Sequence, residues 1–378
     1  MNRRDFVKTA ALAAAGLGVP ALARAAGDVA TGAPGVAVPA FAPTPDTGWR
    51  HFEVTSRITP KAAADGVRVW VPLPSLSEPE WLRPQGNLWQ GNAETMRIER
   101  DPVFGAEMLY AEWLPGTAEP MVEIASRFAT RDRAIDFTRP SATPLALSAE
   151  DQARYTRATE LLPTDGIVRE TALEITKGAK TDEERARAIY DWIVDNTFRD
   201  PKTRGCGLGD IETMLETGYL AGKCADLNAL YVGLARAAGL PARDLYGVRV
   251  ADSRFGYKSL GKSGNISKGQ HCRAEVFLSA FGWVPVDPAD VRKVVLEEPP
   301  GQLALDDPKV LAARARLFGA WEMNWLACND AHDLRLPGST GPTVPFLMYP
   351  QGESAAGRFD SLDPDAFAYA LTARELPG

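Results

Sequence analysis

The feature that most restricts the fold is an apolar run with helical periodicity behind a single cysteine. The run begins at Cys224 in the stretch GKCADLNALYVGLARAAGLPAR, and Gly239-Leu240-Pro241 ends it. Its apolar side chains have the i, i+3, i+4, i+7 spacing of one helix face: Leu227, Leu230, Tyr231 and Leu234. We therefore predict a helix that buries this face and carries Cys224 in its first turn.

The sequence before and after this helix shows other periodicities. Residues 49–131 contain several runs in which apolar residues alternate with period two, and turn residues such as Pro115-Gly116 punctuate them. Two helical patterns, 165–178 and 181–197, come next, and strand patterns return after the cysteine helix. The sequence therefore predicts an α+β fold, in which helices packed on an antiparallel sheet follow an all-β, sandwich-like domain.

These changes of pattern divide the chain. The predicted segments are a signal peptide (1–25), a flexible lead-in (26–45), a β-sandwich-like domain (46–145), a catalytic core (146–295) and a C-terminal extension packed on the core (296–378). Two domains also agree with the usual size of about 150 residues per domain. Within the extension, residues 308–325 have a helical pattern.

The first 25 residues have the features of an export signal. Arg3-Arg4 and Lys8 form a charged start, small apolar residues follow, and Ala23-Arg24-Ala25 resembles a cleavage site. The paired arginines followed by Phe6 resemble the bacterial twin-arginine signal, which predicts a periplasmic or secreted protein. No later stretch approaches the ~18 consecutive apolar residues of a membrane span, so we expect no stable membrane anchor.

Composition narrows the class of partner. The net charge of −7 and the isoelectric point near 5.3 argue against a surface that binds nucleic acid. Four cysteines are too few for a disulfide scaffold, so each needs its own explanation. The cysteines and histidines lack the spacing of structural zinc sites, and the usual nucleotide-binding loops do not occur. We therefore expect neither a metal nor an organic cofactor.

A cysteine in the first turn of a helix can serve two purposes. It can be a small buried hydrophobe in the core. It can instead be a reactive nucleophile, because the unpaired N–H groups and the dipole of a helix start favour the thiolate. The Cys224 N–H would then face the oxyanion of a tetrahedral intermediate, and Gly222 would leave room for a substrate carbonyl. The position of Cys224 alone leaves both possibilities open.

A thiol nucleophile needs a base, and the chain has three histidines. We expect His51 to be a polar strand residue of the N-terminal domain. His271 opens the strand HCRAEVFL, whose alternation places Cys272 on the core face and His271 on the opposite face. The returning strand WVPVD places Asp287 on the side of His271 if the loop has an odd length, whereas an even length would favour Asp290. We predict that Asp287 orients His271.

At these residues the chain resembles the transglutaminase-like superfamily, whose core is related in architecture to papain-like thiol proteases. The likeness covers about residues 165–290 and rests on GKCADLNALYVGLARAAGLPAR and QHCRAEVFLSAFGWVPVDPAD. It implies that Cys224 is the nucleophile, His271 the base and Asp287 the orienting acid. Cys272-Arg273 departs from the small and aromatic pair that often follows the histidine, which affects the substrate pocket more than the triad. The side chain that completes the oxyanion hole is not assigned, and Tyr219 is a guess.

The other cysteines and a C-terminal cluster are less informative. Cys272 is expected to be a buried hydrophobe that faces the core. Cys206 lies in a glycine-rich loop before the cysteine helix and could pair with Cys328, although a sequence cannot establish such a pairing. A tail that wraps onto the core could bring His332 or Trp325 to the substrate groove.

We expect an exported cysteine-dependent enzyme that transfers the acyl group of a peptide or carboxamide through a thioester. Water is favoured as the acceptor, giving a peptidase or amidase, over an amine, giving a cross-linking enzyme. The substrate would be a peptide or protein, and the peptides of the cell wall are candidates. One alternative is a catalytically idle fold that serves as a periplasmic binding or assembly protein, and another is a redox protein with a reversible disulfide at Cys224. The sequence does not indicate an oligomeric state.

Overall fold

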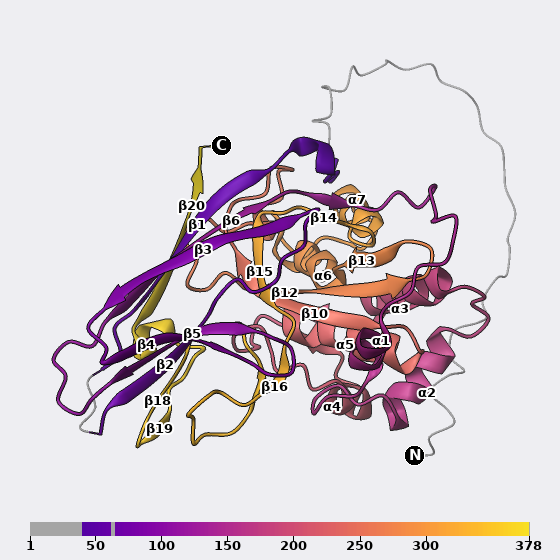
Figure 1. The fold of residues 1–378 in the computed structure, drawn as a ribbon. Coiled ribbons are helices and arrows are strands. Elements are labelled where there is room, and N and C mark those ends of the chain that lie inside the picture. Colours follow the sequence, from indigo (N-terminus) through magenta and orange to yellow (C-terminus); the bar gives the residue numbers. More distant parts are fainter. Residues whose placement is uncertain (1–39, 62–64, 378) are drawn as a thin grey trace, which may run out of the picture. The chain divides into compact units, whose positions relative to one another are not determined.

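The computed structural model describes residues 40–61 and 65–377 (Figure 1). The predicted signal peptide and most of the predicted lead-in lie outside these ranges. In the described part of the chain, no helix has both the length and the apolar composition that a membrane crossing requires.

A four-stranded antiparallel sheet forms the base of the predicted core. Its strands run in the order β13-β12-β10-β15. They are β10 (Ala242–Arg249), β12 (Gln270–Leu278), β13 (Gly282–Val286) and β15 (Trp325–Asn329). Three strands come from one stretch of the chain, whereas β15 comes from the segment expected to be a C-terminal extension. The predicted α+β class, with helices packed on an antiparallel sheet, is confirmed.

Helix α5 (Cys224–Ala237) begins at the cysteine and packs against β10 and β12 (Figure 1). All its residues are buried, although the sequence pattern predicted a single apolar face. The faces of α5 away from the sheet contact other helices: α1 (Ala149–Thr156), α2 (Gly166–Ile175), α3 (Asp182–Asn196), α4 (Ile211–Thr217) and α6 (Pro288–Glu297). Two buried donors on α5 have partners: Asn228 Nδ2 donates to the Cys272 carbonyl (2.8 Å) and Arg236 Nε to the Ala242 carbonyl (2.9 Å).

The start of α3 shows how local sequence fixes these helices. The Glu184 N–H donates to Thr181 Oγ1 (3.1 Å), and the Thr181 N–H donates to the Glu184 carboxylate (3.3 Å). This capping box satisfies N–H groups that the helix itself leaves unpaired. The helix predicted from residue 181 is therefore confirmed.

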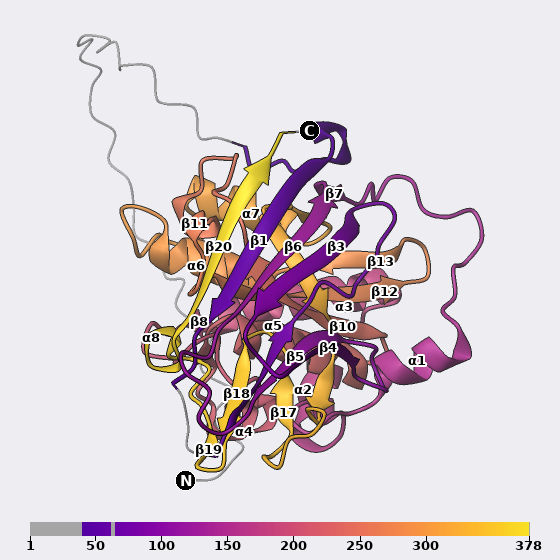
Figure 2. The same ribbon diagram turned by 60° about the vertical axis from the view of Figure 1, so that its left-hand side comes forward.

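Two five-stranded antiparallel sheets contain the N-terminal strands. The first has the order β11-β20-β1-β6-β3 and the second β19-β18-β2-β5-β4. In Figure 2, strand β20 lies along β1, and the register pairs His51 with Leu376. The strands are β1 (Arg50–Ile58), β2 (Val67–Pro72), β3 (Leu82–Gly91), β4 (Thr95–Arg100), β5 (Glu107–Trp113), β6 (Val122–Thr130), β11 (Gly264–Asn265), β18 (Gln351–Ser354), β19 (Gly357–Arg358) and β20 (Tyr369–Leu376).

The C-terminal segment is thus shared among the sheets. Residues 296–378 supply β15 to the core sheet and β18, β19 and β20 to the two N-terminal sheets. One continuous cluster of buried side chains includes Phe52 of β1, Leu230 of α5 and Leu371 of β20. The domain boundaries drawn from the sequence stay a prediction about how the chain is organised.

The helical pattern predicted for residues 308–325 is wrong beyond its first half. Helix α7 (Pro308–Arg316) ends before Gly319, where φ is +110° and an added Cβ would lie 2.5 Å from the Phe137 ring. A glycine fits this position because it tolerates the positive φ and has no Cβ to meet the ring. The chain turns there into β14 (Ala320–Trp321), which pairs with β7 (Arg133–Ala134). The remaining short elements are β8 (Phe198–Arg199), β9 (Ala221–Gly222), β16 (His332–Leu334), β17 (Val344–Phe346) and α8 (Pro364–Phe367).

Candidate active site

Cys224 occupies the first helical position of α5, with Lys223 as the N-cap residue. The N–H groups of this first turn have no partner within the helix, and they favour negative charge at the sulfur. Among the described residues, no acceptor lies on the Cys224 N–H. The position predicted from the sequence therefore provides both an anion-stabilising field and a free backbone donor.

Asp226 fixes the backbone around the cysteine. Its carboxylate accepts hydrogen bonds from the N–H groups of Lys223 (2.9 Å), Leu208 (3.0 Å) and Gly209 (3.0 Å). A Cβ added at Gly222 would lie 2.2 Å from Asp226 Oδ2, and one at Gly207 would lie 1.8 Å from the same atom. Gly222 was expected to leave room for a substrate carbonyl. The space beside it is instead filled by the Asp226 carboxylate.

The loop held by Asp226 brings a second cysteine to the first. The Ala225 N–H donates to the Cys206 carbonyl (2.8 Å), and both Cys206 and Cys224 line one cavity. All four cysteines are free thiols. Cys206 therefore lies beside Cys224, whereas Cys328 lines a separate cavity, and burial raises the pKa of its thiol to about 12.

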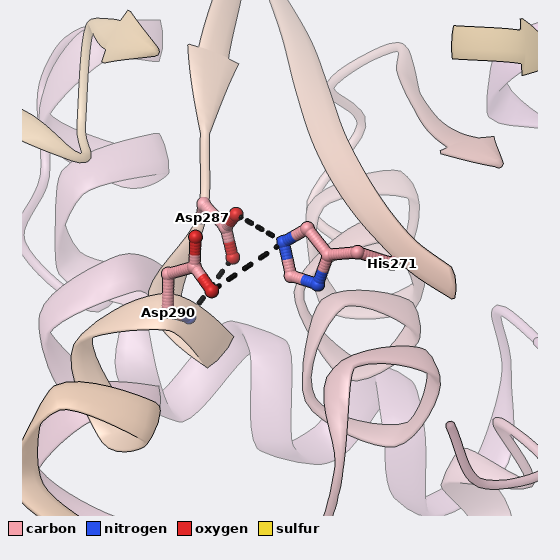
Figure 3. A group of neighbouring side chains, drawn as sticks. All are labelled: His271, Asp287 and Asp290. Carbon is pink, nitrogen blue, oxygen red and sulfur yellow. Dashed lines mark hydrogen bonds and ion pairs between the residues drawn. The ribbon is translucent and has the colours of Figure 1, made fainter. Parts of the chain in front are cut away.

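His271 lies at the start of β12 with two carboxylates against its ring (Figure 3). Its Nε2 is 2.8 Å from Asp287 Oδ2 and 3.5 Å from Asp290 Oδ1. The other ring nitrogen points away from both carboxylates (Figure 3). His271 also lines the same cavity as Cys224. The structure thus brings together the three residues singled out in the sequence, and adds the reserve candidate Asp290.

Several contacts lock the carboxylates and the histidine in place. Asp287 is the N-cap of α6, and its Oδ1 accepts from the Asp290 N–H (3.0 Å) and from Asn228 Nδ2 (3.3 Å). Asp290 accepts two hydrogen bonds from Arg249, one of them at 2.7 Å. Trp325 Nε1 donates to the His271 carbonyl (2.9 Å). The two carboxylates and the backbone of His271 are therefore fixed by side chains from α5, β10 and β15, and the carboxylates hold the ring.

The carboxylates change the protonation of the histidine. Burial lowers the pKa of His271, but Asp290 and then Asp287 raise it to about 9. Burial and the neighbouring Asp290 charge raise the pKa of Asp287. Burial also acts to raise the pKa of Asp290, but Arg249 and the imidazolium outweigh it and hold this pKa well below its usual range. At neutral pH the group therefore contains an imidazolium that faces ionised carboxylate.

The pKa of the Cys224 thiol is lowered, whereas that of His271 is raised. Hydrogen bonds from the Cys206 and Cys272 thiols, together with His271, hold the pKa of Cys224 well below its usual range against the effect of burial. The Cys206 and Cys272 pKa values are raised, by hydrogen bonding to Cys224 and by burial. Cys272 was expected to be only a buried hydrophobe, and it is fully buried. It also lies beside Cys224 and helps to lower the pKa of that thiol.

Other residues considered in the sequence lie elsewhere. Tyr219, the guess for the oxyanion hole, is 56% exposed, and its hydroxyl donates to Asp200 (3.1 Å). His51 hydrogen-bonds with Gln85 in the first N-terminal sheet. His332 is buried beside Tyr246 and lines a different cavity. Trp325 hydrogen-bonds to the backbone of His271 and does not line the cavity. The C-terminal segment instead contributes Tyr349 and Tyr369 to the cavity wall.

Arg273, the departure from the family pattern, lies beneath the site. Its guanidinium lies over the rings of Trp321 and Trp325, and Nη1 donates to the Glu322 carbonyl (3.0 Å). Its Nε is 3.4 Å from Asp287 Oδ2, and burial lowers the pKa of Arg273 to about 10. The residue therefore does not line the cavity and adds a cation behind Asp287.

The same three side chains also have the donor set of a metal site. One donor atom each of His271, Asp287 and Asp290 lie within 4.8 Å of one another. Arg249 and Arg273 already contact the two carboxylates, so a metal ion would meet two guanidinium charges. The arrangement fits a protonated imidazole better than a divalent cation.

The chain is similar in sequence to known proteins. Residues 169–288 match the model of the transglutaminase-like superfamily. The chain is 34% identical over 336 residues to an uncharacterized protein of Haemophilus influenzae, covering 84% of this chain and 89% of that protein.

Two solved structures are more distant. A "putative cysteine protease" from Cytophaga hutchinsonii is 14% identical, with a TM-score of 0.48, covering 86% of this chain and 98% of that one. The periplasmic domain of TgpA from Pseudomonas aeruginosa is 14% identical, with a TM-score of 0.32, covering 64% and 94%. With the matched family model spanning Cys224, His271 and Asp287, the chain belongs to the transglutaminase-like superfamily.

Proposed function

We propose that the protein is a cysteine-dependent acyl-transfer enzyme that acts on peptide or carboxamide bonds. The observation that supports this most is a single cavity that holds both a cysteine with a lowered pKa and a histidine with a raised pKa. A thiolate and an imidazolium at neutral pH are the two species that the chemistry needs. A cysteine that only filled a core would have a raised pKa, as Cys328 has.

In the first half of the reaction the Cys224 thiolate attacks the carbonyl carbon of the amide. The carbonyl π electrons move to oxygen, and the Cys224 N–H donates a hydrogen bond to that oxyanion. The C–N bond then breaks, and His271 gives its proton to the leaving amine. The products are a thioester on Cys224, a free amine and a neutral imidazole.

In the second half an acceptor attacks the thioester. Neutral His271 takes a proton from the acceptor, and the thiolate leaves as the imidazolium forms again. Asp287 holds the ring throughout, since its Oδ2 accepts from Nε2 while its Oδ1 stays bound in the cap of α6. With water as the acceptor the enzyme is a peptidase or amidase, which we favour over cross-linking to an amine.

The place of action belongs to the same proposal. The first 25 residues combine paired arginines, an apolar stretch of small residues and a small-residue cleavage site. A protein exported in this way would meet peptides outside the cytoplasm, including those of the cell wall. A fusion of residues 1–30 to a reporter that needs twin-arginine transport tests this point. Export that survives Arg3-Arg4→Lys-Lys would contradict it.

Alkylation tests the reactive thiol directly. The protein without residues 1–25 is treated with iodoacetamide at pH values from 5 to 10, and each cysteine is quantified by mass spectrometry. We expect Cys224 to react well below pH 8, and His271→Ala to slow it at neutral pH. Cys328 supplies an internal control, because its raised pKa keeps it unreactive in the folded protein. Alkylation of all four thiols only above pH 8 would favour an idle fold with a binding role.

Acyl transfer needs a second measurement. p-Nitrophenyl acetate is a general acyl donor that releases nitrophenolate when a thioester forms, and peptide and amine probes then separate hydrolysis from transfer. We expect a burst equal to one acetyl group per Cys224. A disulfide between Cys224 and Cys206 that forms and reduces reversibly, without any acyl-enzyme, would favour the redox alternative, to which the contact of these thiols points.

A further inference from the structure

The cavity beside Cys224 and His271 has a volume of about 280 Å³ and an unusual wall. Among its described lining residues there is no aspartate or glutamate, although the chain as a whole has 49 acidic and 42 basic residues. Its basic lining residues are Arg199, Lys223, Arg249, Lys262, Lys268 and Lys293. The charge of this wall is therefore opposite to the net charge of −7 of the protein.

Four of these cations have carboxylate partners. Arg249 binds Asp290, and Arg199 binds Glu297. Lys293 is 3.8 Å from Glu297, and the exposed Lys268 is 3.5 Å from Asp365. The carboxylates offset much of the positive charge of these four side chains. The excess positive charge of the cavity wall therefore comes mainly from the other two lysines.

Lys223 and Lys262 differ from the other four. Within residues 40–61 and 65–377, no carboxylate oxygen lies within 4.0 Å of either ammonium group. Lys223 precedes Cys224, and its Nζ donates to the Thr203 carbonyl (2.7 Å), which holds the charge at the cavity wall. An ammonium group bound to one carbonyl still has two donors for a ligand.

Lys262 stands on the segment between β10 and β12. Its N–H donates to the Ala251 carbonyl (3.1 Å), and a Cβ added at the preceding Gly261 would lie 2.6 Å from Asp252 Cα. The backbone before Lys262 is therefore closely packed, whereas the Lys262 side chain itself is exposed. The two unpaired cations come from different segments of the chain and line one cavity.

We infer that this cavity binds a carboxylate of the substrate, so that the acyl donor is an acidic peptide or amide. This inference rests on the proposed function. Lys223 and Lys262 would contact the carboxylate, while the amide carbonyl lies at the Cys224 sulfur. A carboxylate is chosen because it is the anion that unmodified peptides carry, on aspartate, on glutamate and at the C-terminus. An anionic substrate would also be drawn into a cavity of this charge from solution.

A pair of alkylating reagents tests the inference without a known substrate. Iodoacetate and iodoacetamide have the same size and mechanism, but only iodoacetate carries a carboxylate. Both react with the same thiolate, so the ratio of their rates at Cys224 does not depend on how much thiolate is present. At pH 7 and low salt, we expect this ratio to exceed that of free cysteine about tenfold or more, and to fall as salt is added.

Variants separate the lysines from the imidazolium, which is also a cation. Lys223→Gln and Lys262→Gln should each lower the ratio about two- to fivefold, as expected for partly exposed charge pairs. Lys180→Gln, at an exposed lysine outside the cavity, should leave it unchanged. An unchanged ratio in the double variant would overturn the inference. Slow reaction of Cys224 with both reagents at pH 7 would instead contradict the proposed function.

Three small molecules then identify the source of the carboxylate. N-acetylglutamine has a terminal carboxylate, N-acetylglutamic acid α-amide is its isomer with a side-chain carboxylate, and N-acetylglutamine amide is neutral. Each is tested for protection of Cys224 against iodoacetamide. Stronger protection by either acid than by the neutral amide supports the inference, and the better isomer identifies the source. Protection by the neutral amide equal to that by both acids would contradict it.

Discussion

The two ends of strand β12 bury charge in different ways. At one end, Glu275 is fully buried and bound by two arginines, Arg133 and Arg243, the latter at 2.7 Å. The arginines lie over tryptophan rings, as Arg243 does over Trp283, and all three charges stay fixed. At the other end, His271 and Cys224 are also buried, but both can gain or lose a proton.

This contrast indicates which buried charges can perform chemistry. An arginine keeps its proton at any physiological pH, so a carboxylate held by two arginines can only stabilise the structure. At the His271 end the carboxylates instead hold a group whose pKa lies near 9, beside a thiol whose pKa is lowered. That end also opens to a cavity, whereas neither Glu275 nor Arg243 lines it.

Cys224→Ala should be the most damaging substitution and should abolish acyl transfer. Removal of a nucleophile from a catalytic group typically costs about 10⁴-fold or more in kcat, since the remaining groups cannot form the covalent intermediate. The nitrophenolate burst from p-nitrophenyl acetate should disappear. Thermal unfolding should show little change, because the substitution removes one small side chain at the cavity wall. Retention of the burst would mean that another thiol is the nucleophile, and Cys206→Ala would then be examined.

Asp287→Asn should be next in size and should act through the histidine. By comparison with the loss of the orienting carboxylate in serine proteases, kcat should fall about 10²- to 10⁴-fold. The imidazolium is populated below the pKa of His271, which is about 9, so wild-type activity should decline as the pH rises through that value. Removing one carboxylate lowers this pKa, and the basic limb of the pH profile should move to lower pH. A purely structural role would reduce activity without moving that limb.

Glu275→Gln tests the other end of the strand. It leaves Arg133 as a buried charge without a carboxylate, while Arg243 keeps Glu78 (2.8 Å), and the free energy of unfolding should fall by about 3–5 kcal/mol. Urea denaturation measures this loss. The exposed pair of Arg57 and Glu123 gives a control, since Glu123→Gln should cost less than about 1 kcal/mol. Where the Glu275→Gln protein remains folded, the pH profile should keep its basic limb near 9, unlike that of Asp287→Asn.

The sequence predicted the parts of this arrangement that depend on local periodicity. Helical spacing located α5, and strand alternation placed His271 and Asp287 on one side of the hairpin, where the structure shows them in contact. The catalytic roles of these residues stay a prediction. Asp290 was held in reserve for a hairpin loop of even length. Its side chain lies near the ring for another reason, because the start of α6 brings it back toward His271, which strand parity cannot describe.

Contacts between distant segments could not be predicted in this way. The pairing of β20 with β1 joins residues 51 and 376, and no local pattern encodes it. The same holds for the cavity wall, to which Lys262 and Tyr349 come from separate loops. The sequence placed Cys206 in a glycine-rich loop but did not predict its position beside Cys224. That position depends on the Asp226 carboxylate, which accepts hydrogen bonds from the loop N–H groups.

The smallest effect we expect is a shift of the Cys224 titration in Cys206 variants. The Cys206 thiol holds the pKa of Cys224 down, so its loss should raise that pKa. In Cys206→Ala the midpoint of iodoacetamide labelling should move to higher pH, because the thiolate has lost a stabilising donor. Cys206→Ser keeps a hydroxyl donor in nearly the same place and should hold the midpoint low. If both variants shift the midpoint equally, the effect arises from altered packing and not from the hydrogen bond. The thiol cluster would then no longer distinguish the His271 end of β12 from the Glu275 end.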